Sequence, residues 1–122
     1  MKEGAILIDH TTSSPGQAVR IHEEALKKKI HFIDAPVSGG DIGARNGKLV
    51  TMIGGDVEAV AQVKPLLESY SLEIQHMGKA GSGQQTKAAN QILIANTMVG
   101  VCEALVYGQK AGLDLNQMIT LL

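Results

Sequence analysis

The sequence contains few aromatic residues and a single cysteine. One Phe, two Tyr and no Trp occur among its 122 residues, so a folded core must be built almost entirely from aliphatic side chains. The one cysteine, Cys102, excludes an internal disulfide and any metal site made of several thiolates. It follows the apolar residues 99–101, and we therefore expect a buried, unreactive thiol in a reducing, cytoplasmic compartment.

A surplus of charge of either sign is also absent, and so is a long uninterrupted apolar run. The formal net charge is -1, which indicates neither a nucleic-acid partner nor binding to an anionic membrane. The longest mostly apolar stretch, residues 92–106, is interrupted by polar residues and is shorter than the roughly 20 residues that cross a bilayer. We expect it to be a buried helix. Charged residues follow Met1 at once, so no secretory leader is expected.

Strand-like and helix-like segments alternate over the first 80 residues. Apolar residues at helical spacing predict one helix after Ser14 and Pro15 and another after Asp56. Leu26, Val57 and Leu66 are among the side chains expected to face the core, and Pro65 is expected to kink or shorten the second helix. Apolar runs predict strands at residues 5–9, 31–37, 49–53 and about 72–76. This alternation is typical of an α/β fold.

Beyond residue 80 the pattern is entirely helical. A long helix is predicted from about residue 84 to 111, with Gly112 as its C-cap, and a further helix begins at Asp114. We therefore expect two domains, residues 1–80 and 81–122. Because the first strand has no partner before it and the last helix stops at the chain end, we expect the chain to be part of something larger.

Two segments of the first 80 residues could carry chemistry. Residues 9–15 follow a strand and place hydroxyl groups beside a helix N-terminus, where open α/β sheets bind ligands. A plain Ser/Thr helix cap is the alternative. Residues 38–44 are predicted to form a flexible loop. The loop begins with Ser38-Gly39-Gly40, whose backbone N–H groups could bind a carboxylate. An ordinary flexible turn is the alternative there.

A third segment, residues 81–91, opens the long helix. Lys87 lies about one turn inside this helix, with Asn90 and Gln91 three and four residues later on the same face. The neighbouring residues are mostly apolar, so the Lys87 side chain is either extended along an apolar surface or buried for a purpose. A lysine buried in this way is a candidate general acid/base.

Other residue patterns predict no site. The four histidines have no metal-ligand spacing, and no metal is expected. Gly81-Ser82-Gly83 lacks the full G-x-G-x-x-G that follows a strand in dinucleotide-binding folds.

Taken in this order, the three segments resemble the β-hydroxyacid dehydrogenases. The branch they resemble is that of 3-hydroxyisobutyrate dehydrogenase, which includes tartronate semialdehyde and glyoxylate/succinic semialdehyde reductases. Residues 8–15 are similar to the family's cofactor-side segment, residues 34–44 to its substrate-binding motif and residues 81–91 to its catalytic motif. The resemblance implies the C-terminal part of a Rossmann-like NAD(P)-binding domain, followed by a long interdomain helix that opens an all-α domain.

The resemblance also implies an NAD(P)-dependent oxidoreductase that interconverts a small β-hydroxyacid and its semialdehyde or oxo acid. Thr12 would contact the nicotinamide end of NAD or NADP. The substrate carboxylate would be held by Ser38, Gly39 and Gly40. Lys87 would be the general acid/base.

Asn90 and Gln91 would help orient the substrate, with Gln91 standing where many relatives have a second Asn. The related 6-phosphogluconate dehydrogenases have a His-Asn pair at this point, which argues against a sugar phosphate. The family's first strand, its G-x-G-x-x-G turn and its late lysine have no counterpart here. A truncated, non-catalytic binding or oligomerisation module is therefore the alternative. Imine-reducing and nucleosome-binding relatives usually lack the lysine, so they fit less well.

Small residues recur on one face of the long helix, at Gly100, Ala104 and Gly108. Small side chains at this spacing let two helices approach closely, and the family's interdomain helix is often at a subunit interface. We expect a homo-oligomer. Close packing within one subunit is the alternative.

Overall fold

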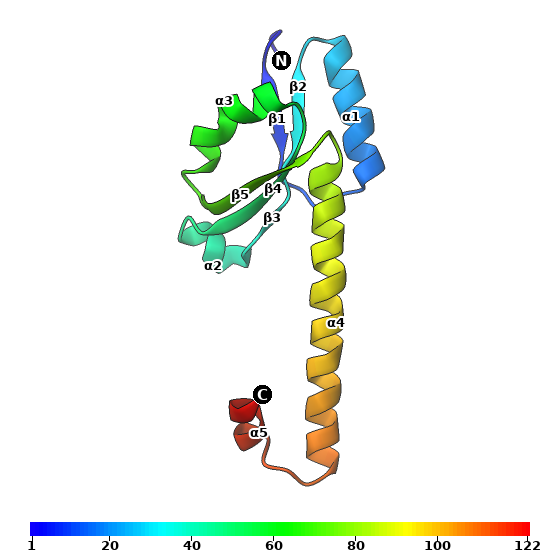
Figure 1. Cartoon of the computed structure of the whole chain (residues 1–122), viewed down its shortest axis with the longest axis vertical. Helices are drawn as coiled ribbons and strands as arrows, with labels where there is room; N and C mark the ends of the chain where they lie inside the picture. Colours follow the sequence, from blue (N-terminus) through cyan, green and yellow to red (C-terminus); the bar gives the residue numbers. More distant parts are fainter. The chain divides into compact units, whose positions relative to one another are not determined.

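The computed structural model describes all 122 residues. They form two compact units, residues 1–88 and 89–122, and the helix α4 runs through both (Figure 1). The elements in chain order are β1 (Ile6–Asp9), α1 (Pro15–Lys27), β2 (His31–Asp34), β3 (Val37–Ser38), α2 (Gly40–Arg45), β4 (Leu49–Gly54), α3 (Val57–Leu67), β5 (Ser71–Gly78), α4 (Ser82–Lys110) and α5 (Leu115–Leu121).

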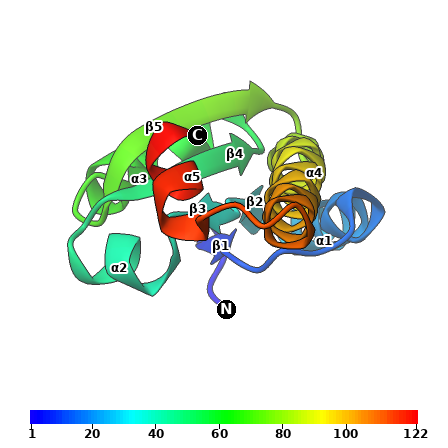
Figure 2. The same ribbon diagram turned by 90° about the horizontal axis from the view of Figure 1, so that it is seen from below.

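A five-stranded mixed sheet forms the centre of the first unit. Its order is β1-β2-β4-β3, with β5 also paired to β4. Strands β1 and β2 are parallel, and so are β4 and β5, whereas β4 runs antiparallel to both β2 and β3. Figure 2 shows β4 and β5 side by side. The predicted α/β class and its helical continuation are confirmed, although the sheet is mixed.

Helices cover both faces of the sheet. Neighbouring residues of β2 point to opposite faces, so Phe32 packs with α1 while Ile33 packs with α3. Figure 1 shows α1 and α3 on opposite sides of β1 and β2. Aliphatic side chains dominate both cores, as the scarcity of aromatic residues requires. Leu26, Val57 and Leu66, which we expected to face the core, are exposed.

The segment expected to be a flexible loop after the second strand is ordered. The predicted strand 31–37 splits into β2 and the short β3, and α2 follows where a loop was predicted. Gly39 (φ 124°) and Gly40 (φ 61°) make the sharp turn between them, in backbone conformations that other residues rarely adopt. The Gly43 N–H then donates to the Gly39 carbonyl and closes the first turn of α2.

Helices α1 and α3 begin where they were predicted to begin, but only one of the two predicted caps forms. The Ser14 hydroxyl caps α1 by accepting from the Gln17 N–H. The Asp56 side chain makes no such bond to α3. Its carboxylate instead lies 3.5 Å from His31 Nδ1 and 4.0 Å from His22 Nε2. Helix α3 continues to Leu67 past Pro65, so the predicted early end does not occur.

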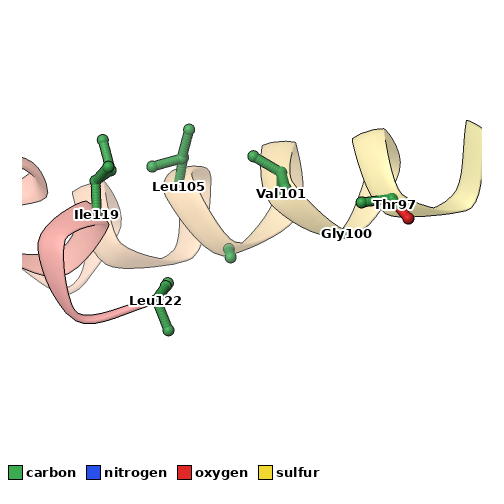
Figure 3. Close-up of a pocket in the computed structure, with 7 residues that line it drawn as sticks. Thr97, Gly100, Val101, Leu105, Ile119 and Leu122 are labelled. Carbon is green, nitrogen blue, oxygen red and sulfur yellow. The ribbon is translucent and has the colours of Figure 1, made fainter. Parts of the chain in front are cut away.

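The second unit contains the remainder of α4 and the short helix α5. Gly112 has a φ of 76°, and the Asp114 carboxylate accepts from the N–H groups of Asn116 and Gln117, so both predicted signals are confirmed. A groove of about 560 Å³ lies along these helices (Figure 3). Its lining residues are almost all apolar: Thr97, Gly100, Val101, Ala104, Leu105, Ile119 and Leu122.

Most apolar side chains of α4 in this unit are exposed. Ile92 and Leu93 are 66% and 67% exposed, and Cys102 is exposed too. The expectations of a buried helix and a buried thiol are therefore wrong for this chain. The length argument fails as well, because α4 has 29 residues and is long and apolar enough, by length and composition, to cross a membrane.

Candidate active site

The carboxylate of Asp34 holds the first turn of α4 against the end of β2. It is completely buried and accepts hydrogen bonds from the backbone N–H groups of Gly81 (2.8 Å) and Gln84 (2.9 Å). The first N–H groups of a helix have no partner within the helix, and a carboxylate is a favourable acceptor for them. The long helix is thus capped by a side chain 47 residues earlier in the chain.

Two glycines let the helix come this close. A Cβ atom on Gly54 would lie 2.5 Å from an Asp34 carboxylate oxygen and 2.8 Å from the Gly83 nitrogen. On Gly83 it would lie 2.6 Å from the carbonyl oxygens of both Asp34 and Met52. Real Cβ atoms do not make such contacts, so both positions require glycine. The Gly-Ser-Gly sequence that opens α4 therefore serves packing against β2 and β4.

Lys87 is buried one turn into α4. Its side chain is inside the protein, with the residue 8% exposed, and its Nζ atom donates to the Val37 carbonyl oxygen and to Ser38 Oγ, both at 2.8 Å. Of the two alternatives for this lysine, extension along the surface is wrong, because the side chain is buried. An ammonium group has three N–H bonds, and two are occupied by these fixed acceptors. No protein acceptor binds the third N–H in this structure.

The segment that begins at Ser38 brings backbone groups next to this lysine. Ser38 is half-buried at the end of β3, and Gly39 and Gly40 are exposed. A Cβ on Gly40 would meet no atom within 4 Å, so the space above that peptide is open to a ligand. The predicted carboxylate-binding residues and Lys87 are therefore brought together.

The predicted cofactor-side segment is tied to the same helix turn by Gln84. The Gln84 side chain is 1% exposed; its Nε2 donates to the Thr11 carbonyl (2.7 Å) and its Oε1 accepts from the Ser13 N–H (3.0 Å). Between these two bonds, Thr12 is exposed. Our sequence reasoning missed Gln84 and Asp34 as parts of the site. In the sequence each is only a polar residue inside a motif, and the neighbouring residues do not indicate that its side chain is buried.

A histidine at the end of β1 makes a second link between strand ends. His10 Nδ1 lies 2.7 Å from the Ala35 carbonyl, which can only accept, so Nδ1 carries the proton. In the neutral ring, Nε2 then accepts from the Tyr70 hydroxyl at 2.9 Å. Burial raises the pKa of the Tyr70 hydroxyl above its usual range. His10 thus has a structural partner on each nitrogen.

Asn90 and Gln91 lie in the second compact unit, and Asn90 Nδ2 donates to Gln91 Oε1 at 3.4 Å. Their substrate-orienting role rests on the resemblance and stays a prediction.

Two models of known protein families match this chain. Residues 1–78 match the model described as the NAD binding domain of 6-phosphogluconate dehydrogenase, and residues 81–122 match that described as NAD-binding of NADP-dependent 3-hydroxyisobutyrate dehydrogenase. Both descriptions name NAD-binding segments, so the expected cofactor, NAD or NADP, is confirmed. The chain belongs to the β-hydroxyacid dehydrogenase family, as the motifs predict.

Individual relatives agree with this family. An uncharacterized oxidoreductase of Bacillus subtilis is 54% identical over 93% of this chain and 39% of its own length. The 3-hydroxyisobutyrate dehydrogenase of Pseudomonas aeruginosa is 43% identical over 89% of this chain and 37% of its own. The solved structure of Mycobacterium tuberculosis 3-hydroxyisobutyrate dehydrogenase with L-serine superimposes with a TM-score of 0.88 at 35% identity, covering 99% of this chain and 43% of that one.

The chain thus spans about two fifths of the length of these relatives. The two family models meet between residues 78 and 81, whereas the compact units divide at residue 88, inside α4. The predicted domain boundary after residue 80 therefore stays a prediction.

Proposed function

We propose that this chain supplies the substrate-binding and proton-transfer residues of an NAD(P)-dependent oxidoreductase that interconverts a small β-hydroxyacid and its semialdehyde or oxo acid. The observation that carries the proposal is the buried Lys87, whose Nζ lies 2.8 Å from Ser38 Oγ. A lysine held by two neutral acceptors has no carboxylate to neutralise it. It is thus available to exchange a proton with a substrate.

The two fixed hydrogen bonds of Lys87 suit a group that both gives and takes a proton. In the ammonium form, the third N–H donates to the carbonyl oxygen of the substrate during reduction. In the neutral amine, the same position is a lone pair that accepts the hydroxyl proton during oxidation. The bonds to Val37 and Ser38 persist in both forms, so the side chain need not move. NAD(P), when bound, supplies or accepts the hydride.

The remaining predicted residues would orient the reactants. Ser38, Gly39 and Gly40 hold the substrate carboxylate through the serine hydroxyl and the backbone N–H groups. Thr12 contacts the nicotinamide end of the cofactor. Two relatives support this class of substrate, because 3-hydroxyisobutyrate, for which one is named, and L-serine, present with the other, both have a carboxylate and a β-hydroxyl group.

A segment graft tests the proposal. In the Pseudomonas aeruginosa 3-hydroxyisobutyrate dehydrogenase, the matching 109 residues are replaced by those of this chain, giving what we call the grafted enzyme. We expect turnover of a β-hydroxyacid with NAD or NADP, and we expect Lys87→Met to abolish turnover while cofactor affinity measured by calorimetry is kept. A matched control is Lys79→Met, an exposed lysine before α4. Normal turnover in the Lys87→Met variant would disprove the assignment.

The alternative, a non-catalytic module, predicts a correctly folded graft without turnover. The second unit has an exposed apolar helix surface and groove. This surface favours assembly with other subunits, whether the chain is part of an enzyme or a non-catalytic module. We propose that a second copy of the subunit covers this surface in a homo-oligomer. A Cβ atom on Gly108 would lie 2.6 Å from the Met118 sulfur of the same chain, whereas one on Gly100 would meet no atom within 4 Å, so the helix face at Gly100 remains open to a partner helix. A monomer in light scattering of the grafted enzyme would contradict the oligomer.

A further inference from the structure

The side-chain amide of Gln84 binds both peptide groups that flank Thr12. Its Nε2 donates to the carbonyl of Thr11, and its Oε1 accepts from the N–H of Ser13. The first belongs to the peptide bond before Thr12 and the second to the peptide bond after it. One planar amide therefore holds the backbone of Thr12 on both sides, while the residue itself stays exposed.

The other end of Gln84 is equally constrained. Its backbone N–H donates to the buried carboxylate of Asp34, and its side chain is 1% exposed. Lys87 follows three residues later on the same helix, a rise of about 4.5 Å. A rigid turn of helix thus joins the amide that holds Thr12 to the amine that faces Ser38.

We propose that Gln84 is a positioning residue that sets the place of the Thr12 segment relative to Lys87. The inference rests on the proposed function, in which Thr12 contacts the nicotinamide end of the cofactor and Lys87 protonates the substrate oxygen. Hydride and proton must reach neighbouring atoms of one carbonyl group, so the distance between the two segments decides whether both transfers align. A misplacement of about 1 Å can cost about 100-fold in rate.

The chemistry demands an amide at this position. Methionine has a similar length but neither donates nor accepts strongly, so both bonds to the Thr12 segment are lost. Glutamate keeps the acceptor for Ser13 but places a carboxylate oxygen against the Thr11 carbonyl. A protonated glutamate restores a donor to Thr11. The next residue, Gln85, is exposed on the same helix turn and is a matched control.

The first measurement uses the 122-residue chain without cofactor. In NMR hydrogen exchange we expect the Ser13 amide to be protected in the wild type and in Gln85→Met, and to exchange about tenfold faster in Gln84→Met, in line with the loss of one hydrogen bond. Equal protection in all three proteins would overturn the inference, because the amide would then not hold the segment.

The second measurement uses the grafted enzyme. We expect Gln84→Met to raise the KM and the calorimetric Kd of the cofactor by about fivefold and to lower kcat by about tenfold, with the KM of the hydroxyacid unchanged. Gln85→Met should match the wild type. Wild-type kcat and cofactor affinity in Gln84→Met would overturn the inference, and so would a fall in kcat no larger than the loss of folded enzyme measured by circular dichroism.

A pH series on Gln84→Glu covers the case in which the methionine variant does not fold. The ratio of its cofactor KM to that of the wild type should fall as the pH is lowered from about 8 to about 6, because protonation restores the donor to Thr11. A constant ratio would count against Gln84 as a positioning residue. If the wild-type graft binds cofactor without turnover, the proposed function fails, while cofactor affinity and Ser13 exchange still decide the role of Gln84.

Discussion

The Nζ atom of Lys87 lies 2.8 Å from the Oγ atom of Ser38, although 49 residues separate them in the chain. Asp34 makes this contact possible, because its buried carboxylate holds the first N–H groups of α4 four residues before Ser38. The lysine and the serine are therefore brought together by one capping interaction between β2 and α4. The following variants test that arrangement.

Ser38→Ala should weaken substrate binding more than it weakens the fold. The variant removes one hydrogen-bond acceptor from Lys87 and the hydroxyl proposed to meet the substrate carboxylate. We expect a loss of unfolding free energy of about 1 kcal/mol and an increase of about tenfold in the hydroxyacid KM of the grafted enzyme. Ser69→Ala, which removes an exposed hydroxyl bonded only locally to Leu66, is the control. An unchanged KM for Ser38→Ala would exclude the proposed carboxylate contact.

Asp34→Asn should destabilise the first unit by about 1–3 kcal/mol, because a carboxylate that accepts two N–H bonds is replaced by an amide with one acceptor. The new NH₂ group would face a backbone N–H in a buried place. Urea unfolding measures the loss. Asp41→Asn, an exposed residue of α2 that pairs with Arg45, should change stability far less. Equal effects of the two variants would show that the cap of α4 contributes nothing specific.

Alanine should be tolerated at Gly100, which is exposed on α4, but not at the buried Gly54 and Gly83. A Cβ at Gly54 or Gly83 would collide with backbone atoms at 2.6–2.8 Å, so we expect each alanine variant to lose at least about 1–3 kcal/mol. A Cβ atom on Gly100 would meet no atom of its own chain within 4 Å, so alanine there should stabilise the monomeric 122-residue chain by about 1 kcal/mol. Thermal melting of the three variants gives the comparison, and wild-type stability of Gly83→Ala would contradict the close packing.

The Tyr70 hydroxyl should titrate above its ordinary pKa of about 10, because burial raises its pKa. The raised pKa means that the folded state favours the protonated hydroxyl. Its contribution to stability is thus complete below the ordinary pKa and is lost as the pH rises through the folded-state value. Ultraviolet titration of Tyr107→Phe, in which Tyr70 is the one remaining tyrosine, measures it. A midpoint at or below the ordinary value would show that the hydroxyl is solvated.

Much of this protein is predictable from the sequence because the signals are local. Apolar runs located the strands, Ser14 and Asp114 marked helix starts by capping them, and Gly112 marked a helix end. The ordered motifs gave the family, and the family gave the cofactor. Lys87 and Ser38 were singled out as candidates without any coordinates.

Other features depend on which segments meet, and no local pattern records that. The polar residues Asp34 and Gln84 are buried only because β2, α4 and the Thr11–Ser13 segment converge on them. Asp56 was predicted to cap α3 but faces His22 and His31, since side chains from α1 and β2 compete for its carboxylate. The loop expected after Ser38 folds into α2, because the turn at Gly39 and Gly40 lets a helix start at once.

The sequence by itself determined the α/β class, the helix ends marked by Ser14, Gly112 and Asp114, and the family, since periodicity, capping and motif order act over a few residues. The tertiary structure decided that Lys87 is buried against Ser38, that Asp34 caps α4 and that Gln84 holds the Thr12 segment. It also decided that the apolar side of α4 is exposed in this chain. Burial and pairing depend on contacts between residues far apart in sequence, and an apolar helix has the same pattern whether its neighbour belongs to its own chain or to another.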